Sequence, residues 1–578
     1  MSARRAATSA LSALLIAPLM ALAPVTPSEA TVGGQFVTTW DTSSRQRIGL
    51  HLYGTVDVTI DWGDGTSTTV TGERSPRLTG PVKHTYADGF DLAEVVVTGT
   101  FTRFGNYPVD YDPPHYASVP WGLLTVEEWG PTGTTDLSGA FAEAQHLSEV
   151  AEIPAGVTDM DHMFYNARDF NQPIADWDVS RVRDMEGMFA ESAFNQPIGA
   201  WDVSRVRNMS AMFAGSPFDQ PIGNWDVSRV TDMAFMFSGN GGYNSFDQPI
   251  GGWNVANVTD MSGMFRGSSF NQPVGGWDVS NVTSMAGMFS GINFGGGDQA
   301  TNRFNQPIGE WDVSNVVSMG SMFNRSAFNQ PIGEWDVSNV QGMGWMFLSS
   351  SFNQPLRRWD VSNVTDMDHM FGNSPFNRTI AGWDTSQVAS MKGMFAGSRF
   401  DRPIGDWDVS GIRHDGDMDG MFEGARRFNQ DLSGWCVPSI TSEPRDFDWF
   451  TPSWVLPRPV WGTCPGNPDY RPVGTYTSVT GDDGVLEARG TATADPHGVG
   501  TVAVGIRDQA TGQWLQRDGT WSAVYEKIWT TLTDPGATST GWKIRRVLPP
   551  GRYGVSLFVK DTWGITNEPR PWRAVTVS

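Results

Sequence analysis

The hydrophobic positions in the middle of this chain recur in one fixed order. One copy of the pattern has apolar side chains at Phe194, Ile198, Trp201, Val203, Val206, Met209, Met212 and Phe213. The segment FNQPIGEWDVSNV occurs letter for letter at 304–316 and again at 328–340, and close variants surround both copies. Because a catalytic motif needs a single copy, the pattern indicates a repeated structural unit.

The tryptophan of the repeat marks its period. The copies are Trp177, Trp201, Trp225, Trp253, Trp277, Trp311, Trp335, Trp359, Trp383, Trp407 and Trp435. Most steps are 24 residues, and the three longer ones coincide with polar or glycine-rich insertions at 239–245, 291–302 and 414–417. Insertions that leave the period intact on both sides are typical of a solenoid, in which each coil contacts only its neighbours.

Each unit is expected to contain a short strand and a short helical segment. The alternation Trp-Asp-Val at 201–203 predicts a strand. Met209, Met212 and Phe213 stand at positions i, i+3 and i+4, which predicts one or two helical turns. Gly-Ser-Pro at 215–217 is expected to end them.

The units resemble those of the BspA-like leucine-rich-repeat surface proteins. The resemblance is carried by Met264-Phe265, by FNQPV at 270–274 and by WDVSNV at 277–282, within a predicted solenoid that covers 121–465 with its end caps. It implies a leucine-rich-repeat-like solenoid of short strands and short helical turns, at or secreted from a bacterial surface and used in adhesion and binding. The predicted fold class is this repeat solenoid flanked by two all-β sandwich domains.

The first and last units depart from the repeat and are interpreted as caps. Residues 137–141 and 160–164 look like degenerate first coils, and the last unit contains Cys436 and ends near Cys464. These are the only two cysteines, and in an oxidising compartment we expect them to form a disulfide. Atypical end units cover the core that terminal coils would otherwise expose.

Both flanks show β-sheet patterning. In residues 31–120, apolar and polar residues alternate from 56 to 62 and Asp64-Gly65 follows, which predicts a strand and a hairpin turn. The stretch DWGDGT at 61–66, with His-Thr-Tyr after it, resembles PKD-type β-sandwich domains. Residues 466–578 alternate in the same way between turn segments, which predicts a second sandwich; its end is similar to that of bacterial immunoglobulin-like modules.

Two repeated features could serve either packing or binding. The tryptophan ladder either forms an internal core or presents a partly exposed platform for sugars; we favour the core, because Trp201 and Val203 share a strand face. The Asn-Gln pair of each unit is expected to satisfy backbone groups of the next coil, since buried polar groups need partners. Asp219, Asp247 and Asp401 replace the asparagine and keep an acceptor.

The N-terminus predicts export. Arg4 and Arg5 precede a short apolar run at 11–22, and Ser-Glu-Ala at 28–30 ends in a residue suited to cleavage, so residues 1–30 are interpreted as a signal peptide. No later segment approaches the ~20 apolar residues of a membrane span. The formal net charge of −23 argues against nucleic acid as a partner. We therefore predict a secreted, extracellular protein, free or associated with the cell surface.

The sequence contains no recognisable catalytic motif. HExxH, a glycine-rich phosphate loop and a Ser-His-Asp order are all absent, so we expect no enzyme, no cofactor and no metal. A glycosidase pair stays open because carboxylates are abundant. The aspartates with two interpretations, calcium ligand or turn residue, are Asp61, Asp64, Asp415, Asp417 and Asp419. The turn is favoured, since the twelfth position of a loop starting at Asp415 is Arg426 and not Glu.

The candidate binding surface consists of two variable columns that follow the last valine of each WDVSxV segment. The predicted binding residues are Arg183, Asp184, Arg207, Asn208, Thr231, Asp232, Thr259, Asp260, Gln341, Thr365 and Asp366. Adjacent variable columns on a strand face are how repeat proteins form extended binding surfaces. The predicted function is a monomeric binding or adhesion scaffold for a protein or glycan ligand on another cell or matrix; the alternative is an assembly of polysaccharide-binding modules that uses tryptophan-rich surfaces.

Overall fold

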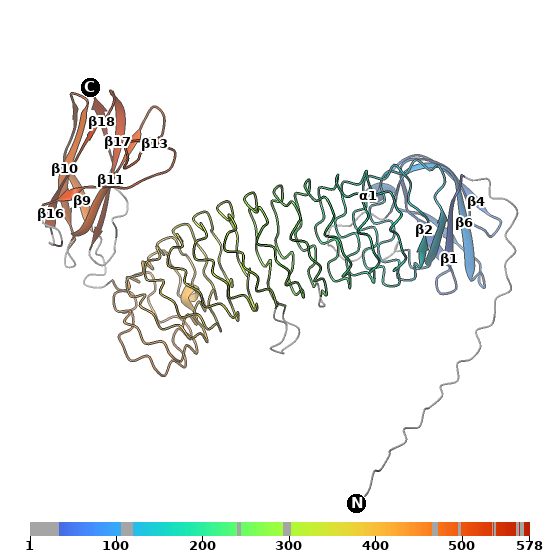
Figure 1. The fold of residues 1–578 in the computed structure, drawn as a ribbon, viewed down its shortest axis with the longest axis horizontal. Helices are drawn as coiled ribbons and strands as arrows, with labels where there is room; N and C mark the ends of the chain where they lie inside the picture. Colours follow the sequence, from blue (N-terminus) through green and yellow to red (C-terminus); the bar gives the residue numbers. More distant parts are fainter. Residues whose placement is uncertain are drawn as a thin grey trace, which may run out of the picture.

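A computed structural model gives the fold of the chain (Figure 1). It describes residues 34–105, 120–239, 244–292, 302–464, 472–494, 499–533, 536, 539–561, 566 and 572–578. The predicted signal peptide at 1–30 lies outside the described residues, as do the centres of the two glycine-rich insertions.

The N-terminal part is a β-sheet domain. Its strands are β1 (Phe36–Asp41), β2 (Arg47–Leu50), β3 (Leu52–Asp61), β4 (Ser67–Arg74), β5 (Val82–Thr85), β6 (Leu92–Phe104), β7 (Leu123–Glu128) and β8 (Glu149–Val150). Six of them form one sheet in the order β4-β3-β6-β1-β7-β8, and β2 pairs with β5. The sheet continues past residue 120, because β7 pairs antiparallel with β1.

The predicted strand and hairpin near residue 60 are confirmed. Val56, Val58 and Ile60 are buried on one side of β3, and β3 pairs antiparallel with β4 around the Asp64-Gly65 turn. The side chain of Asp64 accepts hydrogen bonds from the backbone N–H and the hydroxyl of Thr66 (3.0 and 2.6 Å), and Asp61 accepts the N–H of Gly63. Both aspartates therefore act as turn residues.

Residues that follow the sheet form a long stack of coils (Figure 1). Successive coils pair through a ladder of parallel bridges, which starts at Arg103 in β6, passes through Asp136 and Asp159, and continues one per repeat to Ser390. Two further parallel bridges join Asn244 to Ser268 and Asn302 to Ser326. Backbone N–H groups on this ladder donate to the coil before; for example, the N–H of Arg207 donates to the carbonyl of Arg183 (2.8 Å). Each coil therefore depends on its neighbours for its backbone hydrogen bonds.

The predicted leucine-rich-repeat-like fold class with helical turns is wrong. In the described residues the only helices are α1 (Pro76–Thr79) and η2 (Asp415–Met418), each of four residues. Neither corresponds to the predicted helical segment after the strand of each unit. The protein is instead built almost entirely from β-sheet and from tightly turned coils.

Residues 209–213 show why the helix does not form. The N–H of Met212 donates to the carbonyl of Met209, as in a tight turn, but the N–H of Ala211 donates to Ala234 in the next coil. Ala211 has a φ of 52°, a left-handed conformation that an α-helix excludes. Consecutive tight turns can direct residues i, i+3 and i+4 into the core just as a helix does, so the apolar spacing did not separate the two structures.

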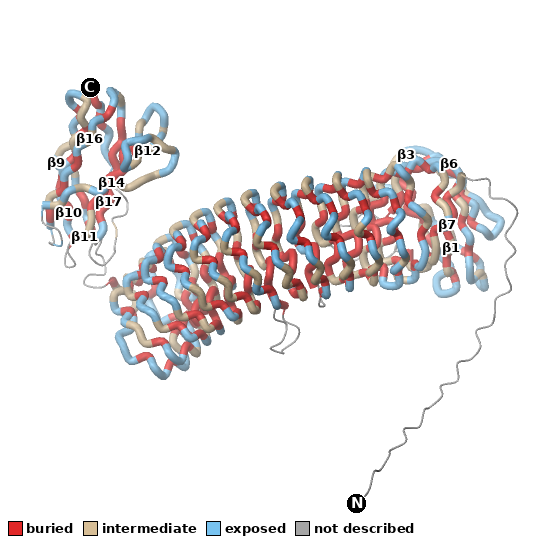
Figure 2. Tube along the Cα trace, viewed as in Figure 1, coloured by how far each residue is buried: buried red, intermediate tan, exposed pale blue. Residues whose placement is uncertain are grey.

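Buried residues recur along the whole stack (Figure 2). The tryptophan ladder is among them and is confirmed as core. Trp277 is 3% exposed, its ring stacks 6.5 Å from that of Trp311, and its indole N–H donates to the backbone carbonyl of Ile250 in the preceding coil. A parallel phenylalanine ladder runs beside it, with Phe265 and Phe289 5.7 Å apart. The repeat tryptophans therefore have no exposed face for a sugar.

The Asn-Gln pair forms a polar ladder at one corner of the coils, as predicted. The side-chain oxygen of Asn305 accepts the backbone N–H of Asn329 (2.9 Å), and the amide of Gln330 donates to the carbonyl of Asn305 (3.1 Å). Where aspartate replaces asparagine the contact persists: Asp219 accepts the N–H of Asp247 at 3.0 Å. The corner needs an acceptor, which either residue supplies.

Both ends of the stack are closed by aromatic side chains. The core of the N-terminal sheet continues into the stack, with ring distances of 5.9 Å from Phe104 to Phe141 and 5.4 Å from Phe141 to Phe164. At the other end Trp454 packs edge-on against Phe422 (5.2 Å), and Cys436 and Cys464 form a disulfide. The N-terminal cap is thus the sheet itself, and residues 137–141 belong to a coil that the sheet covers.

The C-terminal part has a separate core enclosed by two sheets. Its strands are β9 (Val473–Asp482), β10 (Val485–Thr493), β11 (Val499–Asp508), β12 (Trp514–Leu515), β13 (Trp521–Ser522), β14 (Ile528–Trp529), β15 (Thr531–Leu532), β16 (Ser539–Val547), β17 (Gly551–Asp561) and β18 (Trp572–Val577). One sheet has the order β15-β16-β10-β9; the other has β13-β12-β11-β17-β18, with β14 on β11. Val555 and Leu557 of β17 point into the core, as the alternation predicted.

Candidate binding surface

The first predicted column is exposed along the stack. Its residues follow a buried valine, and a strand-like segment turns alternate side chains outward. Arg183, Arg207, Thr231, Thr259, Gln341 and Thr365 are all exposed. Their backbone N–H groups are engaged with the coil before, as in the bond from Gln341 to the carbonyl of Val317 (2.9 Å). Only their side chains are therefore available to a partner.

The second predicted column has a structural role that limits its residues. Asp184, Asn208, Asp232, Asp260 and Asp366 are half-buried, and each side-chain oxygen accepts the N–H two residues later. Such a contact stabilises the turn after the bridge, which explains the preference for short polar side chains here. Burial raises the pKa of Asp184 to about 6 and also raises the pKa of Asp232 and Asp366.

A third column, which the prediction missed, lies two residues before the first on the same face. It begins with Arg181, Arg205 and Arg229, and continues as Asn257, Asn281, Asn315, Asn339 and Asn363, all exposed. Each of these asparagines donates its side-chain amide to a carbonyl of the preceding coil at 2.7 Å. The period-2 relation to the first column was the signal that could have revealed it.

A fourth variable position lies between the two methionines of each unit and has a left-handed backbone. Its residues, with φ from 52° to 65°, are Gly139, His162, Gly187, Ala211, Phe235, Gly263, Gly287, Ser321, Trp345, His369, Gly393 and Gly420. We call this the left-handed column. Trp345 is 45% exposed, Phe235 is 41% exposed, and the rings of Trp345 and His369 are 4.7 Å apart. Bulky residues are uncommon in this conformation.

Glycine in the left-handed column accommodates large neighbours. A Cβ atom on Gly263 would lie 2.4 Å from the ring of Phe235, and one on Gly393 would lie 2.3 Å from the ring of His369. A large side chain of one coil thus lies over the glycine of the next. His162 and His369 are both members of this column, each one residue before the second methionine of its unit.

Titratable groups gather at the first coils without forming a metal site. His162 contacts Asp161; burial lowers the pKa of the imidazole, but this contact and the charges of Glu186 and Asp184 outweigh burial and raise it. Burial likewise raises the pKa of Asp159. Within the described ranges, no group of three or more His, Cys, Asp or Glu side chains is placed to hold a metal ion.

The acidic stretch after residue 414 is held by protein contacts. Asp415 accepts the hydroxyl of Ser442 (2.8 Å), and Asp419 accepts the backbone N–H of Arg445 (2.9 Å). Asp417 lies between them in η2. These contacts assign the stretch to the packing of the last coils.

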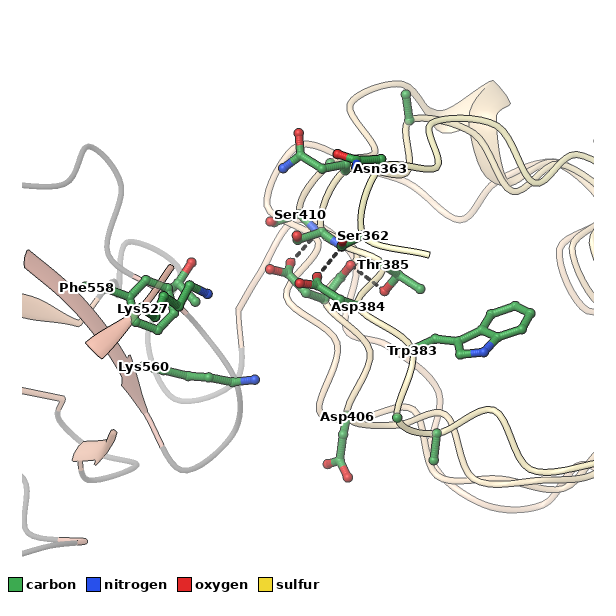
Figure 3. Close-up of a pocket in the computed structure, with 18 of the residues that line it drawn as sticks. Ser362, Asn363, Trp383, Asp384, Thr385, Asp406, Ser410, Lys527, Phe558 and Lys560 are labelled. Atoms are coloured by element: carbon green, nitrogen blue, oxygen red, sulfur yellow. Dashed lines mark hydrogen bonds between the residues drawn. The ribbon is translucent and has the colours of Figure 1, made fainter. Parts of the chain in front are cut away.

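A cleft of about 1220 Å³ lies between the last coils and the C-terminal sheets (Figure 3). One wall carries Lys527, Phe558 and Lys560 of the C-terminal part, with the Lys527 ammonium 3.8 Å from the centre of the Phe558 ring. The other wall carries Asp384 and Asp406 of the coils. The two walls thus present opposite charges to each other.

The described part of the chain contains no helix with the length and apolarity needed to cross a bilayer.

A comparison with curated proteins found no match. A comparison with protein families matched residues 135–244, 194–295, 298–375 and 349–450 to one family, which together cover more than half of the chain and most of the stack. On these matches, the chain belongs to the family described as Mycoplasma protein of unknown function, DUF285.

Proposed function

We propose that this protein is an exported, non-catalytic binding scaffold that acts at or near a bacterial surface. The predicted signal peptide supports export, and membership of a repeat family supports a surface repeat protein. The stack supplies rigidity, because each coil is hydrogen-bonded to both neighbours. Its ligand is a protein or a glycan on another cell or in a matrix.

One observation carries the proposal: residue types on the outer face of the stack change from coil to coil, whereas the buried repeat residues beneath them stay nearly the same. The tryptophans, phenylalanines and corner asparagines repeat almost unchanged because packing requires them. The exposed first column changes from Arg183 through Thr259 to Gln341 on the same backbone. Repeat proteins use variable surface positions on an invariant core for binding.

The test uses the full chain on intact cells and on immobilised matrix proteins. A face variant carries Thr259→Glu, Gln341→Glu and Thr365→Glu. A control variant carries three glutamates at exposed positions away from this face, Asn224→Glu, Ser351→Glu and Thr379→Glu. We expect the face variant to lose binding and the control to retain it. Because Thr259 and Thr365 donate their hydroxyls to carbonyls of the preceding coil, we expect a slightly lower melting temperature for the face variant and an unchanged one for the control. Wild-type protein that binds no surface, or a face variant that binds as wild type, would contradict the proposal.

A second candidate function, polysaccharide binding by tryptophan-rich surfaces, now depends on few residues. The exposed tryptophans of the described chain are Trp345, Trp449, Trp529 and Trp572. Exposed indole rings with a polar edge suit recognition of sugar rings. Alanine substitution of these four residues is expected to abolish binding to a neutral glycan panel if this function holds, while leaving the stack intact.

A further inference from the structure

Five arginines form a compact group on three successive coils. They are Arg181, Arg183, Arg205, Arg207 and Arg229, all exposed, and we call them the arginine grid. Within a coil two positions of the grid are ~6.7 Å apart, and successive coils are ~4.8 Å apart, as expected for strand geometry. The group is notable in a chain with 63 acidic and 40 basic residues.

The fold does not require these arginines, and the chain itself provides the comparison. At the position of Arg181, later coils have asparagines that donate to the preceding coil; Asn281, for example, donates to the carbonyl of Ala256 at 2.7 Å. At the position of Arg183, later coils have threonines such as Thr283, whose hydroxyl donates to the carbonyl of Thr259 (3.1 Å). The five arginines replace residues that bond neighbouring coils.

The guanidinium groups of the grid have no carboxylate partner among the described residues. On the same coils, the exposed aspartates Asp178, Asp202 and Asp226 each accept the backbone N–H of the serine two residues later. Hydrogen bonds from Ser180 lower the pKa of Asp178, and the charge of Arg181 adds to this effect. These aspartates occur in the WDVS segment of most coils, including coils without arginines, so their first role is in the turn.

The grid changes the charge of the outer face locally. The equivalent strip on the coils of Trp311, Trp335 and Trp359 carries three aspartates of the WDVS segment and no arginine. Salt screens charges beyond ~8 Å at physiological ionic strength, so a ligand on the grid experiences mainly these neighbours and little of the net charge of −23. The grid is therefore suited to anionic groups even though the whole protein is acidic.

The surroundings of the grid narrow the ligand class. The backbone N–H of Arg207 is bonded to Arg183 and that of Thr231 to Arg207, so a peptide strand cannot add here by backbone pairing. The aromatic rings of these coils, including Trp201, are buried, so bases of a single-stranded nucleic acid have no stacking platform. The mode of recognition left to the grid is charge-assisted hydrogen bonding from its guanidinium groups to carboxylate or sulfate groups of a ligand.

We propose that the arginine grid binds a linear anionic polysaccharide that lies along the axis of the stack. Two coils carry a pair of arginines and the third carries Arg229, at one coil spacing each, which matches a polymer whose acidic groups recur at a regular step. The inference rests on the proposed binding role of the outer face and names the chemical class of its ligand.

The experiment measures binding of the full chain to dextran sulfate, with unmodified dextran as the uncharged control and poly-glutamate as the peptide control. The grid variant uses the residues that the chain itself places at these positions: R181N, R205N, R229N, R183T and R207T. The charge-matched control replaces five exposed arginines that lie apart along the stack: R266Q, R303Q, R357Q, R399Q and R427Q.

We expect the grid variant to lose about tenfold or more in affinity for dextran sulfate at physiological salt and to show a smaller salt dependence, while keeping the wild-type melting temperature. The control is expected to bind as wild type. Equal losses in both variants would overturn the site, since net charge would then explain them. Preference for poly-glutamate would overturn the ligand class. Wild-type protein that binds cells but not dextran sulfate would overturn this inference alone, whereas binding to neither would overturn the proposed function as well.

Discussion

The indole nitrogen of Trp277 lies 3.2 Å from the backbone carbonyl oxygen of Ile250, one coil away, and donates a hydrogen bond to it. The same contact recurs along the ladder, from Trp201 to Ile174 and from Trp359 to Ile332. Each tryptophan thus fills the core and also joins two coils, because the carbonyl that it bonds already accepts a backbone N–H within its own coil, as Ile250 accepts that of Trp253 (3.1 Å).

Substitution of Trp277 separates these two roles. Trp277→Ala removes the ring and the hydrogen bond and is expected to lower the free energy of unfolding by about 3–5 kcal/mol. Trp277→Phe retains an aromatic ring but removes the indole hydrogen bond to Ile250, whose carbonyl still accepts the N–H of Trp253, so we expect a smaller cost of about 0.5–1.5 kcal/mol. Denaturant titration of both variants checks the order. Equal costs would show that the aromatic ring that phenylalanine retains contributes nothing to stability.

Substitution of the exposed Trp345 should hardly change stability, unlike substitution of the buried Trp335 ten residues earlier. Trp345→Ala removes an exposed ring from a left-handed position and is expected to change stability by less than about 1 kcal/mol, whereas Trp335→Ala should cost about 3–5 kcal/mol. Thermal melting of the two variants makes the comparison. A large loss from Trp345→Ala would mean that its contact with His369 is structural.

The corner ladder requires an acceptor, and Asn305 tests this requirement. Asn305→Ala leaves the N–H of Asn329 and the amide of Gln330 without the side-chain acceptor, at an expected cost of about 1–3 kcal/mol. Asn305→Asp retains the acceptor, as the natural Asp247 does for Asn271, and should be tolerated. Denaturation midpoints of both variants give the answer, and equal destabilisation would contradict the acceptor role.

The pKa of Asp184 predicts that the stability difference between the wild-type protein and Asp184→Asn depends on pH. Burial raises this pKa to about 6 in the folded protein, so the folded state binds the proton more tightly than the unfolded state. The charged carboxylate therefore costs stability above pH ~6, and this cost disappears below the unfolded value of ~3.9. Because water reaches this half-buried carboxylate and screens its charge, Asp184→Asn should stabilise the protein by only about 1 kcal/mol at pH 8 and by less at pH 4.

Unfolding titrations at both pH values, with Asp202→Asn as the exposed control, provide the measurement. A gain at pH 4 that equals the gain at pH 8 would show that ionisation of Asp184 is not the cause.

The disulfide between Cys436 and Cys464 is predicted to stabilise the C-terminal end of the stack. The two residues are 28 positions apart, and closing a loop of this size contributes roughly 2–4 kcal/mol. Cys436→Ser with Cys464→Ser should increase hydrogen exchange around Trp454 and leave exchange around Trp277 unchanged. Faster exchange along the whole stack would indicate that the cap controls global unfolding.

The sequence by itself determined the period, the buried ladder and the polar corner. A step of 24 residues with constant Trp201, Val203 and Met209 allows only a stacked repeat, because one unit is too small to bury its own apolar face. The role of the Asn-Gln pair followed from the need of buried polar groups for partners. The alternation in β3 and β17 likewise identified the inward-facing residues of both flanks.

The tertiary structure alone decided the conformation between Met209 and Phe213. A helix bonds each N–H four residues back, whereas here the N–H of Ala211 and of Phe213 bond to the next coil. A helix and the turned conformation place the same side chains inward. Only the backbone hydrogen bonds to the neighbouring coil therefore distinguish the two structures. Glycines such as Gly187 and Gly263, with positive φ, were the local signs against a helix.

Contacts between coils also decided which variable positions are free to bind. The second predicted column proved to be partly occupied by turn hydrogen bonds, as in Asp232, which accepts the N–H of Ala234. The sequence spacing could have placed Arg181 and Arg205 on the surface, but only the structure shows that Asn281, at the same position of a later coil, bonds to its neighbour. Which side chains a fold uses and which it leaves exposed depends on distances between segments 24 or more residues apart, and these distances exist only in the folded chain.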